Sequence, residues 1–116
     1  MDAKTMAEFD YVGPFVEGLA LVHKNGNWFH VRSDGTPAYE QRYDYVGSFS
    51  EGLAQACLAG QYFHILLNGA PAYEERYSFV GRFFRGVAHV CKDGKWFSIH
   101  PDGTRVVYIF CVMLVS

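Results

Sequence analysis

Two kinds of side chain recur at a fixed spacing in this chain and could together bind a ligand. Histidines stand at His30 and His64, each two residues after an aromatic side chain. These aromatic side chains belong to a column that consists of Trp28, Tyr62 and Trp96. Rings with a polar tip provide a large contact area at low entropic cost, and imidazoles add hydrogen-bonding groups. We therefore expect this row of five residues to bind a protein strand, a glycan or a methylated cation, and the alternative is a packing element repeated along the chain.

The other candidates for catalysis or metal binding do not form a recognised site. No two of the five histidines have the close spacing of a zinc site, so a metal would need ligands from distant parts of the chain. Gly13 and Gly18 have the spacing of a phosphate-binding loop, but Lys followed by Ser or Thr does not come after them. Ser50 lacks the glycine of a nucleophile elbow, because Ser48 stands in its place. We expect no catalytic residue, no metal site, no cofactor and no enzymatic activity.

These columns arise because the chain is built from repeats. Phe9, Tyr43 and Tyr77 are separated by steps of 34 residues, and most positions between them align at the same spacing. Each unit carries Glu-Gly-Leu-Ala or a variant of it, then a glycine before an aromatic pair, then Asp-Gly or Asn-Gly. We expect a single repeat domain over residues 1–116. Its units cover about 9–42, 43–76 and 77–107, and an apolar segment follows at 108–116.

The spacing of the glycines indicates strands rather than helices. In each unit two glycine turns stand nine residues apart, as at Gly26 and Gly35, which leaves room for a strand but not for a packed helix. Asn-Gly and Asp-Gly favour the positive φ angles of two-residue hairpin turns. The expected strands of the first unit are 18–24, 27–33 and 36–39, with 43–49 crossing to the next unit. The sequence therefore predicts an all-β fold of three tandem units of short antiparallel strands in an elongated array, and a closed pseudo-threefold arrangement is the alternative.

Strand alternation separates the expected core from the expected surface. Successive side chains of a strand point to opposite faces of the sheet. Phe29 and Val31 therefore share one face of the middle strand, and they are apolar in every unit. The expected core residues are Phe29, Phe63, Phe97, Val31, Ile65 and Ile99. Trp28 and His30 share the opposite, amphipathic face, which we expect to be accessible.

Three phrases of the chain resemble the WG repeat family, also called the KWG repeat family. The phrases are Phe-Ser-Glu-Gly-Leu-Ala, then Asp-Gly-Lys-Trp, then Asp-Gly, and the resemblance covers about residues 9–107. The chain departs from the family where a second ring replaces the glycine of the Trp-Gly pair, as in Trp28-Phe29, Tyr62-Phe63 and Trp96-Phe97. The resemblance implies tandem β-hairpin modules that mediate binding, and it brings no catalytic residues.

Composition and charge argue against several classes of partner and location. The formal net charge is −2, with acids and bases mixed along the chain, so nucleic acid and anionic membrane are not expected partners. Met1 to Met6 is polar and lacks the apolar core of a secretory signal. Three cysteines are a poor disulfide framework, so we expect a cytoplasmic protein with free thiols. A bridge between Cys57 and Cys91, which share a column, is the alternative.

The apolar segment 108–116 replaces the end of the third unit. It is too short to cross a bilayer, and we expect a strand that caps the array, with self-association through this segment or truncation of a longer protein as alternatives. The expected function is a non-catalytic repeat module that presents a surface for protein–protein interaction. The alternative is carbohydrate or small-ligand binding through the aromatic row.

Overall fold

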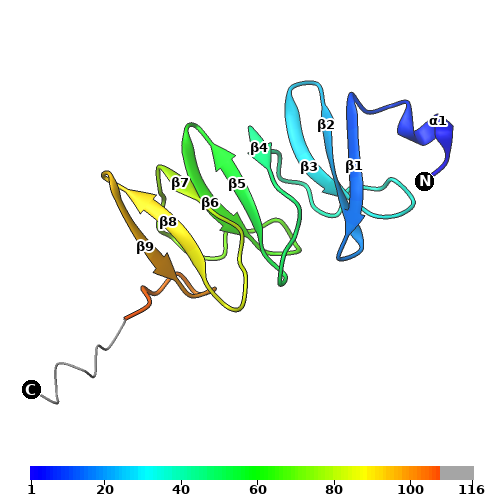
Figure 1. Ribbon diagram of the computed structural model, residues 1–116. Coiled ribbons are helices and arrows are strands. Elements are labelled where there is room, and N and C mark those ends of the chain that lie inside the picture. The colour runs from blue at the N-terminus through cyan, green and yellow to red at the C-terminus, as the bar shows by residue number, and fades with distance from the viewer. Residues whose placement is uncertain (108–116) are drawn as a thin grey trace, which may run out of the picture.

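The computed structural model describes residues 1–107, which contain one short helix and nine strands. The elements are α1 (Ala3–Met6), β1 (Tyr11–Val16), β2 (Leu19–Lys24), β3 (Asn27–Val31), β4 (Tyr45–Val46), β5 (Ala54–Leu58), β6 (Gln61–Ile65), β7 (Phe79–Val80), β8 (Ala88–Lys92) and β9 (Lys95–Ile99). The strands form three antiparallel sheets, in the orders β1-β2-β3, β4-β5-β6 and β7-β8-β9. The predicted all-β fold of three tandem units is therefore confirmed (Figure 1).

Each sheet contains a hairpin that is closed by a two-residue turn. In the first unit Lys24 pairs with Asn27, and the turn residues Asn25 and Gly26 have φ angles of 52° and 81°. Positive φ at both positions is typical of a type I′ turn, whose twist matches that of the flanking strands. The same geometry recurs at Ala59-Gly60 and Asp93-Gly94. These turns are the hairpin turns that the glycine spacing predicts.

The third strand of each sheet is not the one that the sequence predicts. The expected strand at 36–39 is reduced to a single bridge between Val31 and Pro37. Proline has no backbone N–H to donate, so a ladder of hydrogen bonds does not continue through it. The third strand is instead β1, β4 or β7, which precedes the hairpin and pairs with its first strand. The segment expected to cross between units thus completes the sheet of the following unit.

The core is one continuous cluster of apolar side chains from all three units. Phe29, Val31 and their equivalents Phe63, Ile65 and Ile99 are buried, as predicted, and Phe97 packs against the cluster while half-buried. Tyr39 and Tyr43 join it from the loop that links the first unit to the second. Because these two side chains are buried between units, the core is shared across unit boundaries rather than closed within each sheet.

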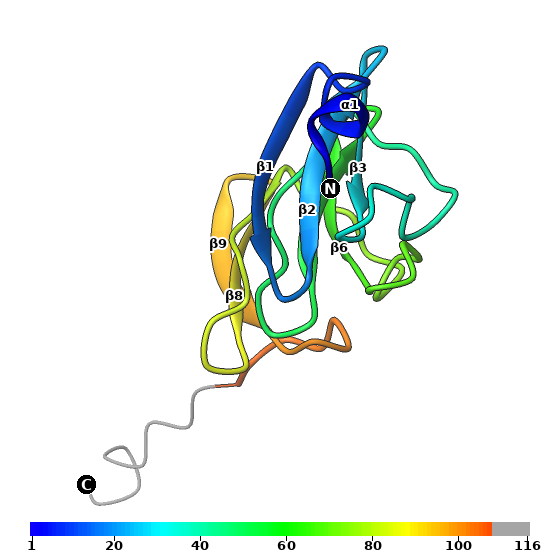
Figure 2. The ribbon, with the colours of Figure 1, turned by 90° about the vertical axis from the view of Figure 1, so that its right-hand side faces the viewer.

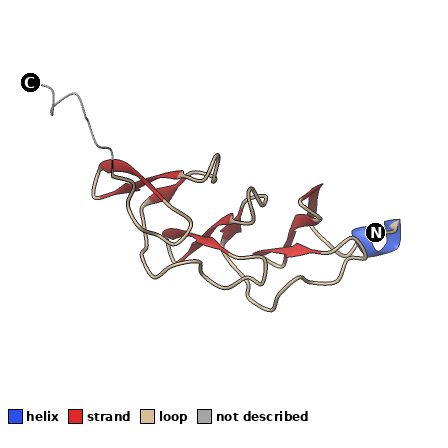
Figure 3. Ribbon diagram, turned by 90° about the horizontal axis from the view of Figure 1, so that it is seen from below, coloured by secondary structure: helices blue, strands red, loops and turns tan. Residues whose placement is uncertain are grey.

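The units form an open row. The principal extents are 67 × 26 × 18 Å, and the three sheets follow one another along the long direction (Figures 1 and 3). Viewed from the end that carries α1, the second and third units lie behind the first (Figure 2). Neighbouring units meet where β3 contacts β4 and where β6 contacts β7. The elongated array is therefore confirmed, and the closed pseudo-threefold arrangement is wrong.

Two expectations concern the ends and thiols of the chain. The segment 108–116, expected to cap the array, lies outside the described residues. Cys57 and Cys91 are free thiols, as expected, so the alternative of a bridge between them is not realised. Within residues 1–107, no helix has the length and apolar character needed to cross a membrane.

Candidate functional site

The candidate site is a row of six aromatic rings that runs along one side of the array. We call this row the aromatic stripe, and it consists of Tyr11, Trp28, Tyr45, Tyr62, Phe79 and Trp96. Each unit contributes one ring from its first strand and one from its last strand. The exposed fractions of Tyr45, Phe79 and Trp96 are 42%, 44% and 61%. Trp28 and Tyr62 are half-buried, and both pack against the core cluster.

Ring contacts join the units along the stripe. The centroid of Trp28 lies 6.0 Å from that of Tyr11 in its own sheet and 5.8 Å from that of Tyr45 in the next. Tyr62 and Phe79 continue the row across the next boundary, with centroids 5.6 Å apart. Trp96 lies 5.9 Å from Phe79 in an edge-to-face arrangement. Tilted and edge-to-face pairs at these distances are favourable for aromatic rings and hold them in place without a ligand.

The middle strand of each sheet supplies smaller side chains between the rings. His23 stands between Tyr11 and Trp28, and its imidazole packs on the indole with centroids 4.7 Å apart. Cys57 occupies the same place between Tyr45 and Tyr62 in the second unit. The stripe therefore has a polar contact point in the first unit and a thiol in the second. The strand register places these groups there, because the paired residues of the three strands of a sheet point to the same face.

His30 and His64 do not lie on this surface, which corrects the expectation that they are accessible beside the aromatic row. Both imidazoles are fully buried. They face the same side of the strand as Trp28, but they stand near its end, where the following unit covers them. The ring of Phe49, from the second unit, packs on His30 with centroids 4.4 Å apart. His64 has the equivalent contact with Phe83 at 4.5 Å.

Each buried histidine links its own unit to the next. His30 Nε2 donates to the carbonyl oxygen of Gly47 at 2.8 Å, and its Nδ1 lies 2.6 Å from the hydroxyl of Tyr39. A carbonyl only accepts, so Nε2 carries the proton of the neutral ring and Tyr39 donates to Nδ1. Burial lowers the pKa of His30 to about 4, against the smaller opposing effect of the Gly47 hydrogen bond. Burial likewise raises the pKa of Tyr39, so both groups remain neutral at pH 7.

The second unit repeats this arrangement. His64 lies 2.5 Å from the Tyr73 hydroxyl and donates to the Gly81 carbonyl at 2.7 Å. Burial lowers the pKa of His64 to about 4 as well. The third unit has Ser98 in the place of the histidine, and its hydroxyl lies 2.9 Å from His89 Nδ1. Among residues 1–107, no three His, Cys, Asp or Glu side chains are grouped so that they could hold a metal ion.

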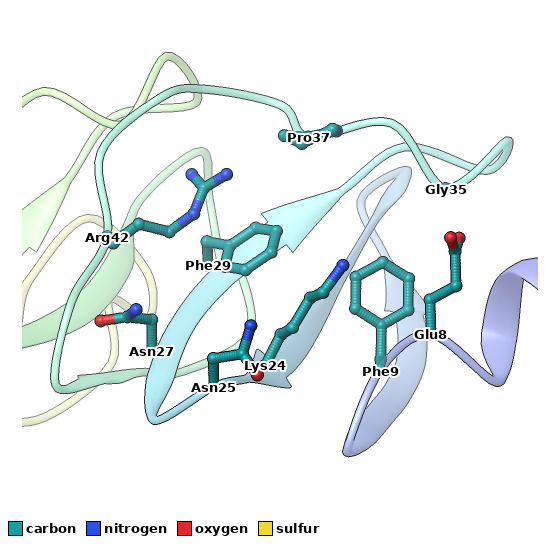
Figure 4. Close-up of a pocket in the computed structure, with 9 residues that line it drawn as sticks. All are labelled: Glu8, Phe9, Lys24, Asn25, Asn27, Phe29, Gly35, Pro37 and Arg42. Carbon is teal, nitrogen blue, oxygen red and sulfur yellow. The ribbon is translucent and has the colours of Figure 1, made fainter.

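A second candidate surface is a series of pockets beside the hairpin turns. The first has a volume of about 410 Å³, and Figure 4 shows the residues that line it. They are Glu8, Phe9, Lys24, Asn25, Asn27, Phe29, Gly35, Pro37 and Arg42. A pocket of about 480 Å³ in the second unit is lined by the equivalents of most of these residues, including Phe63 and Arg76. The polar lining changes between units, since Leu58 stands where Lys24 stands in the first pocket.

The arginines of these pockets are already bound by the protein. The Arg42 guanidinium lies 3.7 Å from the centroid of the Phe29 ring (Figure 4), and its Nη1 donates to the carbonyl oxygens of Tyr39, Glu40 and Gln41. Arg76 makes the same contacts in the second unit. The Arg42 guanidinium therefore holds the loop that it belongs to. We therefore regard the aromatic stripe as the better candidate site.

Sequence reasoning found half of the stripe. Trp28, Tyr62 and Trp96 were predicted from their shared column, and Tyr11, Tyr45 and Phe79 were missed. The signal for them was present, because these three also recur in every unit as the aromatic residue of Asp-Tyr-Val-Gly or its variant. They were missed because this segment was interpreted as a connection between units, so its side chains were not assigned to a face.

Comparison with known proteins identifies the family of the repeat. No curated protein and no solved structure matches the chain. The family model for the WG containing repeat matches residues 7–28, 33–62 and 72–96, which together make up more than half of the chain. The chain therefore belongs to the family of WG containing repeat proteins.

Proposed function

We propose that this protein is a non-catalytic interaction module whose aromatic stripe binds a protein partner. The observation that carries the proposal is the continuity of the stripe, in which an exposed ring contacts a half-buried ring across each of the two unit boundaries. Exposed apolar surface that is contiguous, rather than scattered, is typical of interaction sites on soluble proteins. Aromatic residues are also enriched among the residues that contribute most to protein–protein binding.

The packing of the stripe supports the same proposal. Trp28 is fixed between Tyr11 and Tyr45, so the rings lose little conformational freedom when a partner covers them. His23 and the hydroxyls of the tyrosines provide hydrogen-bonding groups within the apolar stripe. A protein partner with an apolar segment and flanking polar groups would fit this combination.

The absence of a catalytic role is part of the proposal and is supported by the histidines. His30 and His64 recur at the same position of the first two units, and each has both ring nitrogens engaged, Nδ1 within its own unit and Nε2 with the next unit. A general base needs a nitrogen within reach of a substrate. Protonation of His30 and His64 is also suppressed at neutral pH, since burial holds both pKa values at about 4.

Carbohydrate binding is the second candidate, and one observation favours it. The indole of Trp96 is 61% exposed at one end of the stripe, so a flat apolar face is available for stacking. The apolar faces of sugar rings pack on such surfaces. This candidate predicts binding that depends on Trp96 alone rather than on the length of the stripe.

Capture experiments with matched variants test the proposal. The tagged protein is compared with a Phe79→Ala, Trp96→Ala variant, and bound proteins are identified by mass spectrometry. A Phe84→Ala variant is the control, because Phe84 is 53% exposed but lies outside the stripe. We expect the parent and the control to enrich the same protein, and the stripe variant to lose it while its circular dichroism is unchanged.

The same three proteins applied to a glycan array separate the two candidates. Glycan binding that is lost with the Phe79→Ala, Trp96→Ala variant and also with Trp96→Ala alone, added as a fourth protein, together with an empty protein capture, would favour carbohydrate. Identical captured proteins for all three variants, with no glycan bound, would remove the stripe as the binding surface.

A further inference from the structure

Neighbouring units are joined by a carboxylate that binds the turn of the next unit. Glu17 Oε2 accepts a hydrogen bond from the N–H of Glu51 at 2.7 Å, and Oε1 accepts one from the N–H of Gly52 at 2.9 Å. Glu51 then binds the N–H groups of Arg85 and Gly86 in the third unit. In each case a glutamate in a β-turn caps the equivalent turn one unit later, through two charge-assisted hydrogen bonds.

Two further contacts accompany each carboxylate. The buried histidine of one unit donates to a glycine carbonyl of the next, as from His30 to Gly47. The phenylalanine two positions after that glycine packs under the histidine, and this burial leaves Phe49 and Phe83 only 1% and 0% exposed. Each unit therefore has a receiving side, with a turn, a glycine carbonyl and a phenylalanine, and an opposite donating side, which carries a glutamate and a histidine in the first and second units.

The first unit has a receiving side whose turn and phenylalanine are left exposed by the described chain, whereas its glycine, Gly13, is buried. Its phenylalanine, Phe15, is 44% exposed, in contrast to Phe49 and Phe83. Its turn at Glu17 and Gly18 has φ angles of 52° and 82°, close to the 55° and 80° of Glu51 and Gly52. The turn that binds a carboxylate in the second and third units is thus present in the same conformation at the end of the array.

Helix α1 covers a different part of this end. In the later units the ring of a preceding tyrosine packs on a glycine, as Tyr39 does on Gly69. At Gly35 the side chains of Thr5 and Met1 take the place of that ring. Figure 1 shows α1 near the start of β1, whereas the β1–β2 turn lies at the far end of the strand. The helix therefore replaces the tyrosine contact and leaves the turn accessible.

The donating side of the third unit differs from those of the first two. Arg85 stands at the position of Glu17 and Glu51, and Ser98 stands at the position of His30 and His64. An arginine cannot accept hydrogen bonds from a turn, and a serine is too short to replace the histidine contact. Two copies of this chain would therefore not continue the array from the third unit of one to the first unit of the other.

We propose that the N-terminal end of the array is a docking site for a WG unit of a different chain, one that carries glutamate and histidine on its donating side. Its glutamate binds the N–H groups of Glu17 and Gly18, and its histidine ring packs on Phe15, as His30 packs on Phe49. The surface continues an interface that the chain already uses twice. The partner is thus defined by the same glutamate and histidine contacts that join neighbouring units within this chain.

An engineered second copy provides a direct test. The probe is an Arg85→Glu, Ser98→His chain that also carries Phe15→Asp, so that its donating side is restored and its own receiving side is blocked. It is mixed with the parent chain, and the mass of the complex is measured by light scattering after gel filtration. We expect one probe to bind one parent, with shifts in the amide NMR signals of Glu17 and Gly18 of the parent.

Two controls assign any binding to this interface. A parent chain with Phe15→Asp should not bind the probe, and a probe that retains Arg85 and Ser98 should not bind the parent.

If the Ser98→His change prevents folding, Arg85→Glu with Phe15→Asp keeps the carboxylate contact testable, because Arg85 is exposed. A folded probe that leaves the parent monomeric and its Glu17 and Gly18 signals unmoved would overturn the proposal.

Discussion

Gly69 of the second unit packs directly beneath the ring of Tyr39, which belongs to the loop of the first. A Cβ atom at Gly69 would overlap the Cβ and ring atoms of Tyr39. The φ angle of Gly69 is also positive, at 83°. The glycine is thus required both by its own backbone and by the neighbouring unit, and the two requirements can be separated experimentally.

Gly69→Ala should destabilise the protein more than Gly60→Ala. Both glycines have positive φ, so each substitution costs about 1 kcal/mol of backbone strain. Nothing lies within 4 Å of a Cβ at Gly60, whereas Gly69→Ala must also displace Tyr39 and costs about 2 kcal/mol more. Urea denaturation measures both free energies of unfolding. Equal values would contradict the packing of Tyr39 on Gly69.

Acid should destabilise the protein through His30 and His64. Their folded pKa of about 4 lies below the ordinary 6.5, so the unfolded chain binds protons first as the pH falls. The stabilisation is complete above pH 6.5 and is lost as the pH falls towards 4, by on the order of 3 kcal/mol for each histidine. The free energy of unfolding, measured between pH 7.5 and pH 4.5, should fall steeply.

Variants identify the histidines that cause this pH dependence. His64→Gln should lower the stability at pH 7 and flatten its dependence on pH, because one buried titrating group is gone. His100→Gln, at an exposed position, is the control. A parent protein whose stability is constant down to pH 4.5 would show that the imidazoles are not held neutral by burial.

Glu51→Gln should weaken the boundary between the second and third units. The amide retains one oxygen in place of two, so the hydrogen bonds to the N–H groups of Arg85 and Gly86 cannot both be kept in their present form. We expect a loss of about 1 kcal/mol, since these groups are exposed. Glu40→Gln is the control, because Glu40 is exposed and its backbone carbonyl, not its carboxylate, binds Arg42. Thermal unfolding of both variants provides the comparison.

Arg76→Lys should be destabilising although it preserves the charge. The guanidinium lies 4.0 Å from the centroid of Phe63 while its Nη1 donates to three loop carbonyls. A lysine ammonium lacks the planar shape that allows both contacts at once, and we expect a loss of about 1 to 2 kcal/mol. Arg82→Lys, at an exposed position, should change the stability by less than about 0.5 kcal/mol. Similar values for the two variants would contradict this interpretation of Arg76.

Trp96→Ala should have little effect on folding, in contrast to Phe63→Ala. Trp96 is 61% exposed and Phe63 is 2% exposed. Removing a buried phenylalanine costs about 3 to 5 kcal/mol, whereas we expect less than about 1 kcal/mol for Trp96. Chemical denaturation measures both. A large loss for Trp96→Ala would mean that the end of the stripe is part of the core.

The fold could be predicted from the sequence because its main determinants are local. Turn residues such as Asn25 and Gly26 set the hairpins, and alternation assigns Phe29 and Val31 to the core. The histidines were misplaced because alternation gives the side of a strand but not what covers it. His30 shares a side with Trp28, yet the next unit buries it. Contacts between units, such as that from Glu17 to Gly52, join residues that are about one repeat apart in the chain, so no local sequence pattern indicates them.

The open row of units has a consequence for how the protein fluctuates. The second unit is held on one side by Glu17 and His30 and on the other through its own Glu51 and His64. Opening its sheet therefore breaks two boundaries, whereas opening the first or third unit breaks one of them. Backbone amides of β5 should consequently exchange their protons with solvent more slowly than those of β2 or β8, and the last structure to persist should be the middle of the array.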